Sequence, residues 1–262
     1  MAEALAGVDA VIHSAGVAQT MSGIPEDDYR LLNTEATIKL ARAAERAGVK
    51  RFVFLSSVRA QCGSTADGVL TEAQEPQPTD AYGRSKLAAE QGLAETNLDW
   101  VALRLALVYG PGVQGNMARL VELARSPYPL PLSGLKARRS LLSLDNLVEA
   151  TVKVLEAKGP LKRPFIVADP EAMTIAEMIG AMREGLGRRP GLFPLPKPLL
   201  AAALKGMGRS DAYQLLSGSL MADSSALRCV DWVPVTNSRE GLAALMRREI
   251  RPKDAARERA LA

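Results

Sequence analysis

The feature that most constrains the fold of this chain is the alternation of short apolar segments with helical ones. Residues 9–16 (DAVIHSAG), 49–57 (VKRFVFLSS) and 98–110 (LDWVALRLALVYG) have the composition of strands. Residues 26–48, acidic at the start and ended by glycine, and residues 81–90 have helical patterns. Strands and helices that alternate at this spacing form βαβ units with right-handed crossovers. The sequence therefore predicts an α/β fold with a parallel sheet, in which ligands lie beyond the carboxyl ends of the strands.

The second half of the chain has a less regular pattern. We expect a helix over 115–126, a basic loop over 127–140, a strand and then a helix capped by Asp145 within 141–159, and a strand over 164–169. A capping box formed by Thr174 and Glu177 predicts a helix over 173–187. After Arg188 the pattern is of helices broken by prolines, which indicates a small C-terminal lobe. The predicted helical segments there are 190–200, with an amphipathic stretch over 195–208, then 211–218, 224–229 and 238–250, before a charged end over 251–262.

Composition excludes several function classes. Of the 262 residues, 47% are hydrophobic. The sequence nevertheless has no run of 18 apolar residues, the length needed to span a membrane, and no visible signal peptide. The two cysteines are isolated, so they indicate a reducing, cytoplasmic location and no metal site. A net charge of +4, with only four Phe and two Trp, does not indicate nucleic-acid binding.

Tyr82 and Lys86 lie four residues apart in the predicted helix 81–90, so their side chains share one face. A tyrosine titrates near ~10, and lowering that pKa by about 3 units needs ~4 kcal/mol. One cation at ~4 Å supplies about this amount at intermediate dielectric. The pair is therefore a candidate acid/base device, but a Tyr and a Lys on a solvated helix face would have the same spacing.

Five segments in sequence carry a resemblance to a known family. They are VDAVIHSAG (8–16), LLNTEATIKLARAAERAGVKRFVFLSS (31–57), AYGRSKLAAE (81–90), LRLALVYGPG (103–112) and SLLSLDNLVEA (140–150). Together they resemble the extended short-chain dehydrogenase/reductases, and more narrowly the NAD-dependent epimerase/dehydratase family that acts on nucleotide sugars. The resemblance implies a Rossmann-like, doubly wound parallel sheet with a small, mostly helical C-terminal lobe. Residues 1–168 would form the dinucleotide-binding core and 169–262 the substrate lobe, with part of 112–145 contributing to the substrate site.

The resemblance also implies roles for individual residues. Tyr82 would be the catalytic base, Lys86 the partner that lowers its pKa, and Ser57 the third member of the trio. A sugar hydroxyl would lie between Ser57 and Tyr82 and lose its proton while hydride leaves the same carbon for the nicotinamide. The cofactor would be NAD or NADP, with NAD favoured. The residues expected to bind it are Ser14, Ala15, Gly16, Asn33, Tyr82 and Lys86.

The substrate side carries fewer matches. In the resembling epimerases an asparagine and an arginine hold the diphosphate, and Asn116 and Arg139 stand at those places, beside the Ser57 contact to the sugar. Asn116 could equally cap a helix, and Arg139 could be a surface residue. Leu107 stands where the family often has an asparagine that contacts the substrate. Some relatives use a further arginine near the C-terminal lobe, and Arg209 is only a candidate for it.

Other chemistries are disfavoured. His13 is the sole histidine and has no hydrolase arrangement around it, so we expect a structural role at the end of its strand. Dehydratases of the family carry an acidic pair after the residue that matches Ser57, whereas Val58 and Arg59 follow here. No metal site is expected.

The largest departure from the family is at the start of the chain. A dinucleotide fold opens with a strand, a glycine-rich turn and a helix, and no such element precedes the 9–16 strand. On the order of 60 residues would be missing relative to the family, judged from two βα units plus a strand. We therefore expect this chain alone to bind dinucleotide weakly or not at all, which an NADH fluorescence titration tests.

The leading functional expectation is a nucleotide-sugar 4-epimerase or 4-keto reductase, with a UDP-sugar as substrate. The alternatives are another extended dehydrogenase, of the 3β-hydroxysteroid or flavonoid reductase type, and an inactive or cofactor-sensing protein. A homodimer formed through a four-helix contact that includes the helix of residues 81–90 is expected from the resemblance alone.

Overall fold

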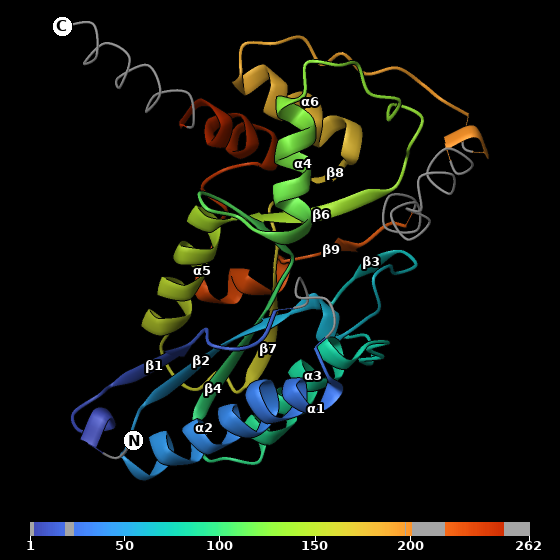
Figure 1. The fold of residues 1–262 in the computed structure, drawn as a ribbon. Helices are drawn as coiled ribbons and strands as arrows, with labels where there is room; N and C mark the ends of the chain where they lie inside the picture. The colour runs from blue at the N-terminus through green and yellow to red at the C-terminus, as the bar shows by residue number, and fades with distance from the viewer. Residues whose placement is uncertain (1–2, 19–23, 197, 201–217, 249–262) are drawn as a thin grey trace, which may run out of the picture.

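The main sheet is parallel and has four strands. The computed structural model describes residues 3–18, 24–196, 198–200 and 218–248. Its strands are β1 (Ala10–His13), β2 (Arg51–Ser57), β4 (Asp99–Leu105) and β7 (Arg163–Val167), hydrogen-bonded in the order β1-β2-β4-β7. All pair in parallel, with Ser57 beside Leu105 and Leu105 beside Val167. This arrangement confirms the predicted α/β fold (Figure 1).

Helices cover both faces of this sheet because β2 is apolar on both sides. Phe52 and Phe54 lie in one core with α2 (Ala36–Arg46) and α3 (Ala81–Ala94). Val53 lies in a second core, with α5 (Leu144–Glu156). Alternate residues of a strand point to opposite faces, so the sheet is doubly wound, as expected for a Rossmann-like fold (Figure 1).

The helix predicted over 26–48 forms as one continuous helical run, but it is not α-helical throughout. It comprises α1 (Glu26–Tyr29), the π-helical segment η2 (Arg30–Glu35) and α2. Asn33 in η2 is fully buried. A π turn inserts one residue into the helical register and often occurs at a functional site, a change that amphipathic periodicity does not reveal.

The strand predicted over 98–110 is divided between two sheets. After Leu105 the Ala106 N–H bonds Val167 O at 3.0 Å, and β5 (Leu107–Tyr109) then pairs with β6 (Arg138–Ser143). β6 continues antiparallel to β8 (Ala172–Thr174). Three residues of β6 therefore come from the segment predicted as a basic loop, because their pairing partners are distant in sequence.

The C-terminal lobe has its own hydrophobic core. It contains residues of α4 (Gly115–Arg125), of α6 (Ile175–Gly185) and of the helix at 238–248. The lobe thus draws residues from both sides of position 168, where we expected the division. Between α6 and the helix at 238–248 the chain returns to the main sheet, where Leu227 and Trp232 join the core of α5.

Two predicted helix caps have different outcomes. The Thr174–Glu177 capping box is confirmed. Asp145 is not the cap of α5: Ser143 Oγ accepts from Asn146 N at 3.1 Å, so Asp145 lies in the first turn. Residues 190–196 are not helical, and Leu192 instead forms a β-bridge with Leu130.

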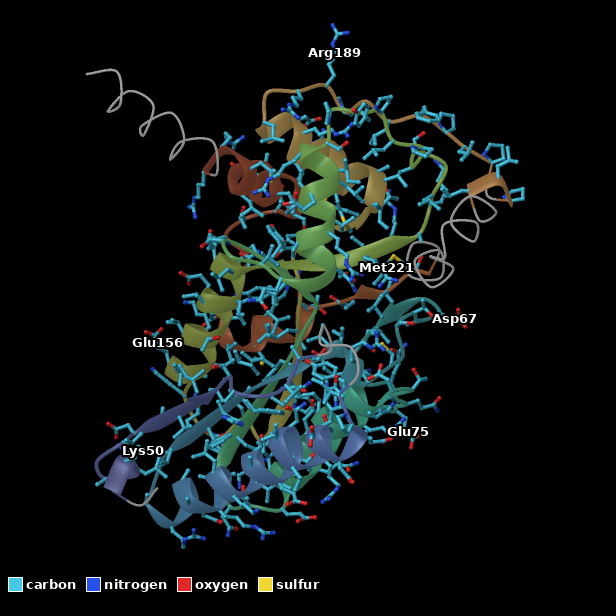
Figure 2. All side chains as sticks on the ribbon, viewed as in Figure 1. Lys50, Asp67, Glu75, Glu156, Arg189 and Met221 are labelled. Carbon is cyan, nitrogen blue, oxygen red and sulfur yellow. The ribbon has the colours of Figure 1, made fainter. Side chains whose placement is uncertain are left out.

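The remaining helical and strand elements of the described residues are short. They are η1 (Glu3–Leu5), η3 (Val58–Ala60), β3 (Val69–Leu70), β9 (Met221–Ala222) and η4 (Ser225–Val230). Figure 2 places Lys50, just before β2, at the far end of the molecule from Arg189, which follows α6. Arg209, most of the helical segments predicted over 195–208 and 211–218, and the charged end over 251–262 lie outside the described residues.

The described residues contain neither a membrane-spanning helix nor a cluster of metal-ligating side chains. None of their helices has the length and apolar character needed to cross a bilayer. No cluster of three or more His, Cys, Asp or Glu side chains that could hold a metal ion occurs among them.

Candidate active site

Ser57 and Tyr82 come together where β2 ends and α3 begins. Ser57, the last residue of β2, is buried, and its Oγ accepts from Arg59 N at 3.2 Å. Asp80 caps α3 by accepting from Gly83 N at 2.7 Å, which fixes the first turn that carries Tyr82. Ser57 lies near enough to the Tyr82 phenol to lower its pKa. A substrate hydroxyl placed between these two oxygens would have a donor and an acceptor within reach.

The pKa of Tyr82 is raised above the ordinary tyrosine value. Burial is the main cause, and it outweighs the Ser57 hydroxyl and the Arg59 charge, which both lower it. Asp80 and Tyr29 raise it further, and the Tyr29 ring lies edge-on at 6.1 Å between centroids. We expected Lys86 to lower this pKa. In the structure burial dominates, and the cation that acts on the phenol is Arg59.

Lys86 lies one turn further along α3 and is buried. Its Nζ donates to Leu55 O at 2.9 Å and lies 4.5 Å from the Phe54 ring centroid and 5.9 Å from that of Tyr82. Burial lowers the pKa of Lys86 to about 8, while Glu90 acts in the opposite direction. The Lys86 ammonium is therefore held by the backbone of β2, 5.9 Å from the centre of the Tyr82 ring.

Asn33 joins the loop after β1 to α3. Its amide exchanges two hydrogen bonds with the backbone of Val17, at 2.7 and 3.1 Å, and donates to Ser85 Oγ at 3.1 Å. A Cβ added at Gly16 would come within 2.7 Å of Asn33 Oδ1 and 3.7 Å of Lys86 Nζ. The loop of Ser14, Ala15 and Gly16 is exposed to solvent, and glycine is needed where it approaches Asn33.

His13 has a structural position behind this loop. Thr37 Oγ1 donates to Asn33 O at 2.7 Å, so it must accept the 2.8 Å hydrogen bond from His13 Nε2–H. The ring stacks on Phe54 at 5.7 Å, and burial, followed by the Lys86 charge, lowers the pKa of His13. The neutral His13 imidazole therefore holds the Thr37 hydroxyl, and through it the backbone carbonyl of Asn33 in η2.

The two predicted diphosphate residues lie on separate elements. Asn116 is exposed in the first turn of α4, whose N-cap is Gln114 rather than Asn116 or Gly115. Arg139 is half-buried on β6, and its Nη1 donates to Ser64 O at 3.3 Å in the loop after η3. The pKa of Arg139 is lowered by burial and then by the Arg59 charge. Arg139 thus faces the loop that follows Ser57, whereas no described contact joins Asn116 to it.

A buried network that sequence reasoning missed lies beneath the site. Glu90 accepts from Ser56 Oγ at 2.5 Å and pairs with Arg104 at 2.6 Å, and Arg104 donates to Gln61 Oε1 at 2.9 Å. These four residues are all at most 4% exposed. The only sequence signal was the four-residue spacing of Glu90 from Lys86, because the other partners lie on β2, β4 and the turn after η3.

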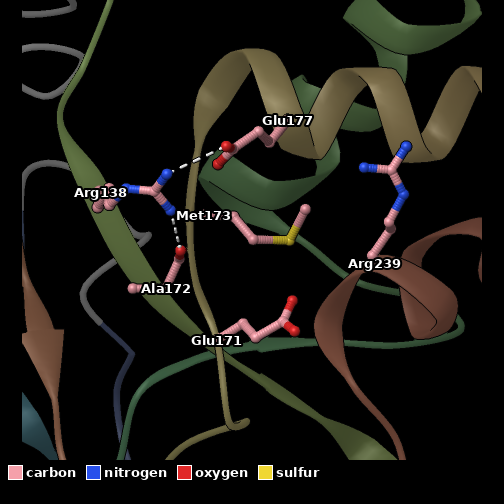
Figure 3. A pocket seen from close by; sticks show the side chains of 6 residues that line it. All are labelled: Arg138, Glu171, Ala172, Met173, Glu177 and Arg239. Carbon is pink, nitrogen blue, oxygen red and sulfur yellow. Dashed lines mark hydrogen bonds and ion pairs between the residues drawn. The ribbon is translucent and has the colours of Figure 1, made fainter.

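A pocket of about 300 Å³ lies in the C-terminal lobe, away from these residues (Figure 3). Three of its four charged side chains, those of Arg138, Glu177 and Arg239, are already paired. Arg138 binds Ala172 O at 2.7 Å and Glu177 at 3.2 Å, and Arg239 pairs with Glu184 at 2.7 Å. None of the predicted site residues lines this pocket.

Comparisons with known proteins agree with this architecture. The chain is 33% identical over 243 residues to a UDP-glucose 4-epimerase from Vibrio cholerae, which covers 88% of the chain and 74% of that protein. It is 28% identical over 209 residues to a Mycobacterium tuberculosis 3 beta-hydroxysteroid dehydrogenase/Delta 5→4-isomerase, covering 72% of the chain but 55% of that protein. The chain therefore spans only about half the length of some curated relatives.

Solved structures show the same fold. MoeE5 in complex with UDP-glucose and NAD superposes with a TM-score of 0.75 at 25% identity, covering 96% of this chain and 82% of the other. A UDP-galactose 4-epimerase superposes with a TM-score of 0.71 at 21% identity, covering 93% and 78%. The model of the NAD dependent epimerase/dehydratase family matches residues 1–168, well over half of the chain. The chain belongs to the NAD dependent epimerase/dehydratase family.

Proposed function

We propose that the protein is a nucleotide-sugar 4-epimerase that acts on a UDP-sugar with NAD, with 4-keto reduction as the alternative outcome of the same chemistry. The observation that carries the proposal is the convergence of Ser57, Tyr82 and Lys86 at the end of β2 and the start of α3. The 33% identity to a protein named UDP-glucose 4-epimerase supports the substrate class.

The residues around the loop after β1 fit a nicotinamide cofactor. The space at Gly16 would be filled by any Cβ, and Lys86 Nζ lies next to it. Ser14, Ala15, Gly16, Asn33, Tyr82 and Lys86 would hold the cofactor. When bound, a nicotinamide cofactor would supply the acceptor for a hydride from the sugar carbon and the donor that returns it to the opposite face.

The protein's own residues move the proton. Ser57 orients the sugar hydroxyl, and Tyr82 takes its proton as the carbon is oxidised. Because burial raises the pKa of Tyr82, the phenol is protonated at neutral pH in this structure and suits the return step, in which the keto oxygen gains a proton. Arg59 is the nearby cation that lowers the pKa of Tyr82 and so favours the tyrosinate needed for the forward step, and Lys86 Nζ lies 5.9 Å from the Tyr82 ring centroid.

The test is an assay of the full chain with NAD and UDP-glucose or UDP-galactose. An epimerase interconverts the two sugars with no net change in NADH, whereas a reductase consumes reduced cofactor stoichiometrically. Tyr82→Phe should lower kcat by about 10²–10⁴-fold. Tyr128→Phe is the matched control, because Tyr128 is 72% exposed in a loop. If the wild-type chain loaded with NAD converts no nucleotide sugar but oxidises a 3β-hydroxysteroid, the steroid alternative is correct.

The diphosphate assignment has its own test in two adjacent arginines. Arg139→Met should raise the KM for the UDP-sugar about tenfold or more with little change in kcat, as expected for a lost charged hydrogen bond. Arg138→Met is the control, since Arg138 points to Ala172 O and Glu177 instead. Equal KM values for both variants would remove Arg139 from the substrate site.

A further inference from the structure

Arg59 lies between the two segments that carry the catalytic hydroxyls. Its backbone N–H donates to Ser57 Oγ at 3.2 Å, and its guanidinium pairs with the Asp80 carboxylate. Asp80 uses one oxygen for Arg59 and the other to cap α3 through Gly83 N at 2.7 Å. One carboxylate is therefore bonded both to the turn after Ser57 and to the helix that carries Tyr82.

The backbones of these two segments are also in direct contact. A Cβ added at Gly83 would come within 2.3 Å of Arg59 O and 3.0 Å of Pro78 Cβ, so only glycine permits this approach. The side chains of Arg59 and Asp80 are only 13% and 30% exposed. By contrast, Arg84 of α3 pairs with Glu26 of α1, and these side chains are 48% and 66% exposed, where solvent screens an ion pair.

We propose that the Arg59–Asp80 ion pair is a positioning device that sets the separation of the Ser57 hydroxyl and the Tyr82 phenol. The proposal rests on the proposed catalytic function of Ser57 and Tyr82. Arg59 and Asp80 act through these two residues, and neither is assigned a contact with the substrate.

The pair also has an electrostatic effect that a purely structural contact would lack. The groups facing the Tyr82 phenol are Arg59 from η3, Asp80 from the cap of α3, Tyr29 from α1 and Lys86 from the next turn. Arg59 lowers the pKa of Tyr82 and Asp80 raises it. Removing the cation should therefore raise this pKa, and removing the carboxylate charge should lower it.

The experiment uses Arg59→Met, Arg59→Lys and Asp80→Asn in the full chain, with Arg84→Met as the matched control. Arg59→Met should lower kcat by about 10²-fold with little change in KM, as expected when reacting groups are displaced by about 1 Å. Arg59→Lys, which retains the charge, should recover most of that loss, and Arg84→Met should have wild-type activity. Tyrosinate absorbance, taken as the difference between each variant and its Tyr82→Phe counterpart, should show the Tyr82 midpoint moving up in Arg59→Met and down in Asp80→Asn.

The titration needs neither substrate nor activity, so it separates this proposal from the proposed function. If the wild-type chain converts no nucleotide sugar, opposite shifts of the Tyr82 midpoint still support the pair, and unchanged midpoints overturn it. Shifts in the same direction for both variants would indicate general loosening and also overturn it. If Arg59→Met does not fold, Arg59→Lys and Asp80→Asn, compared with wild type, decide the question by the same titration and by kcat.

Discussion

Lys86 is 5% exposed and carries an amine in an apolar setting, with its Nζ against the Phe54 ring. A single hydrogen bond to Leu55 O does not replace the hydration that the ammonium loses, so burial lowers its pKa to about 8. Glu90 opposes this shift, but its carboxylate is already engaged by Arg104 and Ser56. The positive charge of Lys86 is therefore held at a cost to folding.

The cost predicts how stability depends on pH. Below about pH 8, Lys86 is protonated in both the folded and the unfolded state, so stability does not change with pH through this group. Between about pH 8 and 10.5 only the unfolded state binds the proton, so the Lys86 contribution to the free energy of unfolding rises with pH, by about 3 kcal/mol in all. Lys86→Met should lack this rise.

The measurement is urea unfolding of wild type and Lys86→Met across that pH window. Lys39→Met is the control, since the Lys39 side chain is 71% exposed and its curve should parallel that of wild type. Parallel curves for wild type and Lys86→Met would mean that Lys86 titrates alike in both states.

At the scale of elements, two helices end on a buried arginine. Arg51, at the start of β2, donates to Ala157 O at 2.9 Å and Gly159 O at 2.7 Å after α5, and pairs with Asp99 at 2.6 Å. Arg183 of α6 is 3% exposed, and none of its described contacts is with a carboxylate. Its acceptors are six carbonyls around the end of α4 and the 190–191 turn: Leu123, Ala124, Ser126, Tyr128, Pro190 and Gly191. The last carbonyls of a helix have no N–H donor within the helix, and the five N–H groups of the guanidinium supply donors to such carbonyls here.

Arg183→Met should lower the free energy of unfolding by about 3 kcal/mol, because several buried carbonyls lose their donor at once. Arg183→Lys keeps the charge but has fewer donors, so its loss should be intermediate. Arg188→Met is the control, since exposed Arg188 makes a single bond to Arg125 O. Chemical denaturation measures all three, and a loss in Arg188→Met as large as in Arg183→Met would contradict the assigned role.

Elements with a strong local pattern could be predicted from the sequence, and those set by distant partners could not. The apolar run over 49–57 and the Thr174–Glu177 box carry their own signals, and both elements formed. The break at Ala106 depends on Val167 and on β6, and the buried position of Arg183 depends on α4. At the site, the motif predicts Ser57, Tyr82 and Lys86, whereas the Arg59–Asp80 pair depends on the packing of η3 on α3, which the sequence does not reveal.

At the scale of the whole molecule, Asp169 joins the main sheet to the C-terminal lobe. It is 3% exposed and follows β7. Its carboxylate accepts from Ser143 N, Asn146 Nδ2, Tyr109 OH and Ser238 Oγ at 2.7–3.0 Å. Asn146 extends the network to the backbone of residues 235–236. The helix at 238–248 is thereby held to β5, β6 and α5 by one carboxylate, which also raises the pKa of Tyr109, after burial as the larger cause.

Asp169→Asn should loosen the lobe more than the sheet. The new amide can serve only part of the four donors, so we expect a loss of about 3 kcal/mol in the free energy of unfolding. Hydrogen exchange should accelerate in residues 235–248, while β2, which makes none of these bonds, should stay protected. Asp145→Asn is the control, because Asp145 is exposed on the same helix as Asn146. Equal acceleration in β2 and in 235–248 would mean that the two parts open together, and Asp169 would then stabilise one cooperative unit rather than a joint between two.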